Sequence, residues 1–213
     1  MNLGTRSVLF GVHCFWWHPI TVLMAYRKLW ARWPSFIELI CIAVHDLGYW
    51  GSPDIDGPEG RLHSIRSGDL AFRIVYRLYY FLLWFRFGTS CARYFAAGIA
   101  SEARDIVRYH SRWASCEFGK PISNLCWPDK FSITMEPRWF YLFRARLSGE
   151  IWEYTGRACD KPPKEWYVWY LSRLNIEWGE SKFCHRQGTS YCDSFISAPI
   201  RRIRELSNPD EYR

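Results

Sequence analysis

The chain has 213 residues, of which 49% are hydrophobic, 19% aromatic and 23% charged. This length and this supply of large apolar side chains suffice for one sizeable core, and they exclude a chain that is disordered throughout. No Gly-X-Y period, heptad run or longer internal repeat occurs, which excludes fibrous and solenoid folds. The formal net charge of +7 favours anionic partners such as nucleotides, nucleic acid or acidic lipid.

The eight cysteines form no C-x-x-C pair, so the sequence contains neither a zinc ribbon nor a thioredoxin-like motif. Cys14 and Cys41 have the apolar neighbours that are typical of a buried free thiol. No small-residue cleavage site follows the first apolar run, so we expect a reducing, cytoplasmic location. Cys184, His185 and Cys192 suggest a metal knuckle, but their spacing is unusual and a fourth ligand is missing.

One segment has the length of a membrane span, because 20 residues without Asp, Glu, Lys or Arg separate Arg6 from Arg27. Two histidines and a proline lie in its middle, and a buried helix entered by a loop explains it without placing imidazoles in lipid. A later apolar stretch, residues 74–87, is interrupted by Arg77 and Arg86. We therefore expect no integral membrane insertion.

Helical spacing dominates the first sixty residues. Pro19 suits a first helical turn, and residues at i, i+4, i+7 and i+11 from His18 form one face of a helix. A second helix is expected over residues 37–44, ended by Gly48. The Gly- and Pro-rich residues 51–60 predict a loop.

Helical patterns also dominate the rest of the chain. An apolar and aromatic helix is expected over residues 70–87, with a spacing that favours burial. Ser101 is expected to cap a further helix that carries His110 on its apolar face. Additional helices are expected over residues 138–154 and, as a basic helix, near residues 198–206. No segment alternates strongly enough to predict a strand, so the predicted fold is all-α.

The histidines are the residues most informative about function. There are six, and five of them precede residue 111. His18 opens one predicted helix, and His45 is followed directly by Asp46 at the end of the next. A single histidine is more often structural than functional. Imidazoles and carboxylates that converge from several helices, however, are what a divalent transition metal requires.

The ordered set of motifs resembles the HD-domain superfamily of metal-dependent phosphohydrolases. The motifs are His18 in WHPITVLMAYRKL, the His45–Asp46 pair in AVHDLGYWG, and Asp129 in LCWPDKFS. Phe131 stands where the closing Asp-Lys-Leu phrase of the family has Leu. The resemblance covers roughly residues 13–155 and leaves the C-terminal sixty residues unexplained.

The resemblance implies a compact HD-like helical domain over residues 1–157, with a C-terminal extension of unknown role over residues 158–213. It also implies a site for one or two divalent ions of Mn, Fe, Ni, Co or Zn. The candidate metal ligands are His18, His45, Asp46, His63, His110 and Asp129.

In the two-metal arrangement, Asp46 bridges the ions and a bridging water is activated for attack on a phosphoester. His18, His45 and Asp129 complete the first ion, while His63 and His110 hold the second. Asp46, His63 and His110 are the candidate catalytic residues. With a single metal, the last two become general acids or phosphate ligands.

Four further residues are candidates for contacts with the substrate. Lys130 and Arg112 lie beside proposed ligands and can neutralise phosphate oxygens. Glu59, four residues before a ligand histidine, can orient that ligand or take a proton. His13 is a rival of His18 for the first ligand position, because the two differ by about 140° on a continuous helix.

The expected function is hydrolysis of a nucleotide or another small phosphoester, by a phosphomonoesterase or phosphodiesterase mechanism. Since HD-like di-iron sites also activate oxygen, an iron oxygenase remains an alternative. A non-enzymatic nucleic-acid-binding protein is another, because arginine and aromatic residues interleave over residues 73–87 and near the C-terminus. A peripheral membrane protein is a further alternative, and the sequence leaves the oligomeric state open.

Overall fold

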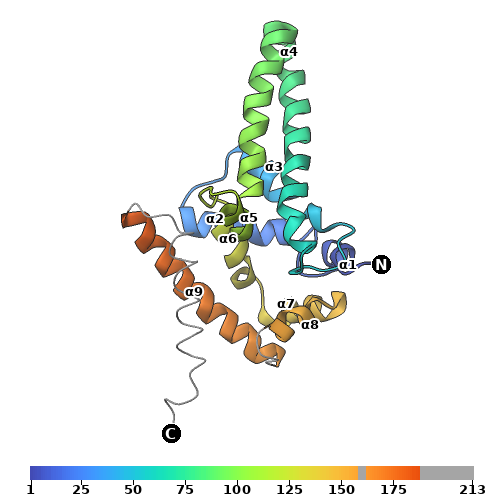
Figure 1. The fold of residues 1–213 in the computed structure, drawn as a ribbon, viewed down its shortest axis with the longest axis vertical. Coiled ribbons are helices and arrows are strands. Elements are labelled where there is room, and N and C mark those ends of the chain that lie inside the picture. The colour runs from blue at the N-terminus through green and yellow to red at the C-terminus, as the bar shows by residue number, and fades with distance from the viewer. Residues whose placement is uncertain (158–161, 188–213) are drawn as a thin grey trace.

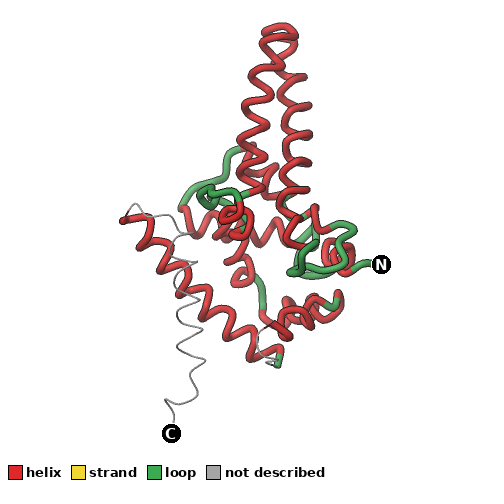
Figure 2. The backbone as a smooth tube through the Cα atoms, in the orientation of Figure 1, coloured by secondary structure: helices red, strands yellow, loops and turns green. Residues whose placement is uncertain are grey.

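Helices joined by short turns form the part of the chain that the structure describes, residues 1–157 and 162–187 of a computed structural model (Figures 1 and 2). Within these residues there is no strand, which confirms the predicted all-α class. The α-helices are α1 (Leu3–Phe10), α2 (His18–Trp30), α3 (Phe36–Val44), α4 (His63–Arg108), α5 (Arg112–Glu117), α6 (Cys126–Phe131), α7 (Arg138–Ser148), α8 (Glu150–Arg157) and α9 (Pro163–Gln187). The short 3-10 helices are η1 (Leu47–Tyr49), η2 (Gly60–Leu62) and η3 (Ser132–Met135).

Helix α4 is a hairpin of two arms that project from the rest of the molecule (Figure 1). Gly88 separates the arms with φ 73° and ψ 174°, a conformation that suits glycine and interrupts the helix. At the base of the hairpin, Ala71 and Val75 of the first arm share a buried cluster with Ala100 and Ala103 of the second. Helices α2 and α3 complete this cluster, so the base of the hairpin is part of the core while its tip is not.

Two predicted helix boundaries were wrong. Ser101 caps no helix, because it lies inside the second arm, which ends at Arg108 and leaves His110 in the following turn. The alanines that pack against the first arm keep that helix continuous through Ser101. The helix expected over residues 138–154 is two helices, since Gly149 adopts φ 94° and ends α7.

Gly48 was predicted to end the second helix, but α3 already ends at Val44. Gly48 instead lies in η1, where a Cβ atom would be 2.1 Å from the backbone oxygen of His63. Its N–H donates a hydrogen bond of 2.7 Å to Ser67 Oγ. The absence of a side chain therefore lets the turn after Asp46 press against the start of α4.

Helix α9 packs against α6, α7 and α8 and contributes to a second core. The buried residues of that core include Tyr141, Leu142, Ala145, Ile151, Trp166, Tyr167 and Leu174. The division of the chain at residue 157 remains a prediction. The expected basic helix near residues 198–206 and the side chains of the knuckle at Cys184, His185 and Cys192 lie outside the described residues.

No described helix combines the length and the apolar composition that crossing a bilayer requires.

Candidate metal centre

The candidate site forms where helices from distant parts of the sequence meet. His18 is the first residue of α2, with Pro19 in its first turn, and the hydroxyl of Thr21 donates to the backbone oxygen of His18. His45 follows the last residue of α3, so Asp46 is held at the entry to η1. Helix α6 supplies the last carboxylate, and α2 packs directly against α6.

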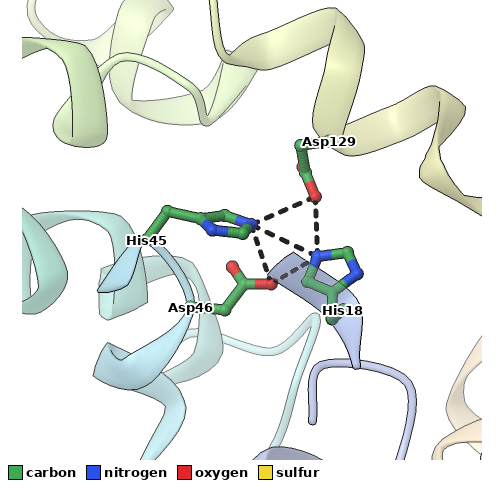
Figure 3. A group of neighbouring side chains, drawn as sticks. All are labelled: His18, His45, Asp46 and Asp129. Carbon is green, nitrogen blue, oxygen red and sulfur yellow. Dashed lines mark hydrogen bonds and ion pairs between the residues drawn. The ribbon is translucent and has the colours of Figure 1, made fainter. Parts of the chain in front are cut away.

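Four buried side chains, His18, His45, Asp46 and Asp129, form the first metal group and point toward one another (Figure 3). His18 Nε2 lies 3.0 Å from Asp46 Oδ2 and 3.2 Å from Asp129 Oδ1. His45 Nε2 lies 3.2 Å from Asp46 Oδ2 and 3.4 Å from Asp129 Oδ1. One ligand atom of each residue lies within 4.8 Å of the others, so the group can hold a metal ion.

Asp46, His63 and His110 form the second metal group. Asp46 Oδ1 lies 3.6 Å from His110 Nε2 and 3.7 Å from His63 Nε2, and these two nitrogens are 3.3 Å apart. His63 is the first residue of α4 and His110 follows its last turn, so the two imidazoles stand at the two feet of the hairpin. Asp46 thus belongs to both groups through different oxygens.

Backbone carbonyls orient three of the imidazoles. The Nδ1 atoms of His45, His63 and His110 lie 2.9, 2.7 and 2.5 Å from the carbonyl oxygen of the residue three positions earlier. Because a carbonyl can only accept, Nδ1 carries the proton and Nε2 of each neutral ring presents a lone pair. The lone pairs of His63 and His110 therefore face each other at 3.3 Å, an arrangement that a bound cation stabilises.

The surroundings of the site keep the imidazole of His63 neutral and the carboxylate of Asp46 ionised. Burial, together with the nearby His110, lowers the pKa of His63 to about 3. Burial opposes the charge of Asp46, but the imidazoles around it, His45 first, hold its pKa well below the usual range. Within the described part of the chain, the buried Oδ2 of Asp46 accepts no hydrogen bond. This orphaned oxygen and the lone pairs that face it are the donor set of a divalent metal.

A cavity of about 550 Å³ opens onto both metal groups. Its wall carries His18, Asp46, His63 and Asp129 beside basic and aromatic side chains. The basic residues are Arg61, Arg112, Lys130 and Arg173, and the aromatic residues include Tyr49, Trp113, Tyr141, Trp166, Trp169 and Tyr170. The cavity is therefore suited to an anionic substrate with a flat or apolar portion.

Two of the predicted substrate residues line this cavity. Lys130 Nζ lies 2.6 Å from Asp129 Oδ2, so its charge supports a proposed ligand as well as facing the cavity. Arg112 forms an ion pair with Glu177 of α9 and also lines the cavity. Glu177 is in turn bound by Arg173, one turn earlier on the same helix.

The other two predicted substrate residues lie elsewhere or have other partners. Glu59 is exposed, forms an ion pair of 2.6 Å with Arg66, and does not line the cavity. His13 lines the cavity but belongs to neither metal group, and its Nδ1 lies 2.8 Å from Ser7 Oγ and 3.3 Å from Glu150 Oε2. Of the two candidates for the first ligand position, His18 belongs to a metal group and His13 does not.

The cavity residues contributed by α9 were not among the residues predicted for the site. Trp166, Trp169, Tyr170 and Arg173 follow the i, i+3, i+4, i+7 pattern of one helix face. That spacing could have identified the face, but not that it turns toward the histidines. Arg61, which flanks His63 in the sequence and was considered for substrate binding on that ground, also lines the cavity.

No protein-family model, curated protein or solved structure matches this chain. Membership of the HD-domain superfamily therefore remains a prediction from the sequence motifs.

Proposed function

We propose that this protein is a metal-dependent phosphohydrolase of the HD type that acts on a nucleotide or another small phosphoester. The observation that carries the proposal is the pair of metal groups that share Asp46 inside a basic, aromatic cavity. Six ligand side chains from five places in the sequence would not be expected to converge, with the Nε2 atoms of three imidazoles turned inward, in a purely structural core.

The ligand side chains are prepared for divalent ions. Asp46 directs one oxygen toward each group, and backbone carbonyls fix the orientation of His45, His63 and His110. Divalent ions bound by these residues supply an activated water and positive charge for the oxygens of a phosphoester. Lys130 keeps the carboxyl of Asp129 ionised by holding its pKa low against the effect of burial.

Residues of the cavity wall would bind the substrate. Arg61, Arg112 and Arg173 offer guanidinium groups that match the oxygens of a phosphate. Trp169 and Tyr170 offer flat faces against which a base or another planar group can stack. In this arrangement the imidazoles and carboxylates bind the metal ions at the reacting phosphate, and the cavity wall beside α9 binds the rest of the substrate.

The test is phosphate release by the full-length protein after reconstitution with Mn, Fe, Co, Ni or Zn. Substrates are nucleoside mono-, di- and triphosphates, together with the diester bis(p-nitrophenyl) phosphate, whose hydrolysis is followed by release of p-nitrophenol because it frees no inorganic phosphate. Oxygen uptake is measured in parallel. We expect metal-dependent hydrolysis that Asp46→Asn abolishes and Glu59→Gln leaves unchanged. Absence of hydrolysis in every reconstituted sample would contradict the proposal, as would oxygen uptake by the iron protein without phosphate release.

A further inference from the structure

The upper part of the α4 hairpin, residues 81–95, is here called the hairpin tip. It stands clear of the body of the molecule (Figure 1). Its large aromatic side chains are exposed rather than packed, with exposed fractions between 46% and 78%. They are Phe81, Trp84, Phe85, Phe87, Tyr94 and Phe95. A buried helix was predicted over residues 70–87, and this prediction is wrong for the tip because only the base of the hairpin reaches α2 and α3.

The exposed side chains surround the first arm instead of forming one stripe. At about 100° per residue, Phe81, Leu82, Trp84, Phe85 and Phe87 spread over roughly 220° of the helix. A seam between two helices needs a narrower apolar stripe, as in a coiled coil. Exposure over so much of the circumference favours an apolar medium around the tip over a single flat protein partner.

The upper part of the hairpin carries charge of one sign only, whereas its base also contains Asp69, Glu102 and Asp105. Residues 70–101 contain no Asp, Glu or Lys, and their only charged side chains are four exposed arginines. These are Arg73, Arg77, Arg86 and Arg93. Arg73 and Arg77 stand on the shaft below the tip, while Arg86 and Arg93 lie within it, where long side chains can extend toward phosphate groups. A row of arginines among aromatic rings is complementary to anionic lipid headgroups above an acyl layer.

We propose that the hairpin tip docks on the surface of a membrane that contains anionic lipid. Phe81 and Phe95 both lie seven residues from Gly88, about 10 Å along a helix, close to the ~5–10 Å that interfacial apolar faces enter a bilayer. The aromatic rings occupy the boundary between headgroups and acyl chains, and the arginines contact the phosphates. His63 and His110 stand at the feet of the hairpin, at the opposite end from the tip, so this proposal does not rest on the proposed function.

The experiment is flotation of the full-length protein with vesicles of phosphatidylcholine, with and without phosphatidylserine. We expect binding to the phosphatidylserine vesicles that weakens at high salt. The double variant Phe81→Ser/Phe85→Ser should lower partitioning at least tenfold, because two buried rings are lost. Arg93→Ala should lower binding to anionic vesicles about fivefold, because Arg93 is exposed and lies five residues from Gly88, within the tip. Trp139→Ser is the matched control, since Trp139 on α7 is 70% exposed, as is Phe85, and lies outside the hairpin.

Three results would overturn the proposal. The first is that the wild-type protein fails to float with anionic vesicles. The second is that the double variant binds as well as wild type, which would place the contact elsewhere in the chain. The third is that size-exclusion chromatography with light scattering shows an oligomer that the double variant dissociates, without vesicle binding, which would make the tip a self-association surface. Thermal unfolding followed by circular dichroism verifies that the variant is folded, as expected for exposed residues.

Discussion

Replacement of Asp46 by Asn removes the one carboxylate that the two metal groups share, with little change in side-chain volume. In the wild-type protein, Asp46 Oδ2 lies within 3.2 Å of two imidazole nitrogens and Oδ1 within 3.7 Å of two others. The substitution leaves the first group with one negative charge, from Asp129, and the second with none. Both groups should therefore lose affinity for a divalent ion.

The expected loss of metal affinity can be judged from the ligands that remain in each group. Removing an outer-shell partner of a metal ligand typically costs 10–100-fold in affinity, so removing a ligand should cost at least about 100-fold. The first group keeps His18, His45 and Asp129 and should bind one ion weakly. The second group is left with two neutral imidazoles, His63 and His110, and should be empty at micromolar protein concentration.

The assay is metal content by inductively coupled plasma mass spectrometry after dialysis, with dissociation constants from calorimetric titration. Wild type should retain two equivalents and Asp46→Asn fewer than one. His110→Ala should retain one, because it belongs only to the second group. Asp56→Asn is the matched control, since Asp56 lines the same cavity but belongs to neither metal group, and it should retain two.

Two results would refute this reasoning. If Asp46→Asn bound two ions with wild-type affinity, Asp46 would not be a shared ligand. If His110→Ala lost both ions, the two groups would be a single site that does not divide between the feet of the hairpin and α2.

Three further substitutions test charges in and around the core. Lys130→Ala should keep the metal content in the reconstituted protein, because a bound divalent ion itself keeps Asp129 ionised, and should lower kcat/KM for the substrate about tenfold to hundredfold; unchanged kinetics would assign Lys130 no role in binding. Arg144→Met leaves the buried Glu136 without its ion pair and should lower the free energy of unfolding by about 3–5 kcal/mol in urea titrations, whereas a loss below about 1 kcal/mol would contradict this. The hydrogen bonds from Arg32 lower the pKa of Glu38 to about 2 against the effect of burial. The ion pair therefore stabilises the fold above the ordinary carboxyl pKa and is lost as pH falls toward 2. Glu38→Gln should cost about 0.5–1 kcal/mol at neutral pH, and urea titrations at decreasing pH should show this cost disappear; a cost that persisted near pH 2 would contradict it.

The sequence was sufficient for the fold class and for the core of the site because both depend on local signals. Pro19 marks the start of the helix that His18 opens, and the His45–Asp46 pair follows directly after a short apolar helix. The combination of histidines and carboxylates then indicates a site for a divalent transition metal. His63 and His110 were correctly grouped with Asp46, although His110 was expected inside a helix rather than after one.

The rest of the site depends on contacts between distant residues, which periodicity does not encode. The turn at Gly88 interrupts a long apolar and aromatic run and makes a hairpin where a single buried helix was expected. The close approach of Gly48 to His63 is visible only once η1 meets the start of α4. In α9, the spacing of Trp166 and Trp169 predicts a common face, but only the packing of α9 against α6, α7 and α8 turns it toward the cavity.

The most direct test of the central claim is anomalous X-ray diffraction from crystals of the full-length protein reconstituted with manganese or zinc. We predict two anomalous peaks about 3.5–4 Å apart with the carboxylate of Asp46 between them. One should lie among His18, His45 and Asp129, and the other between His63 and His110. A map without a metal peak at these side chains would contradict the account.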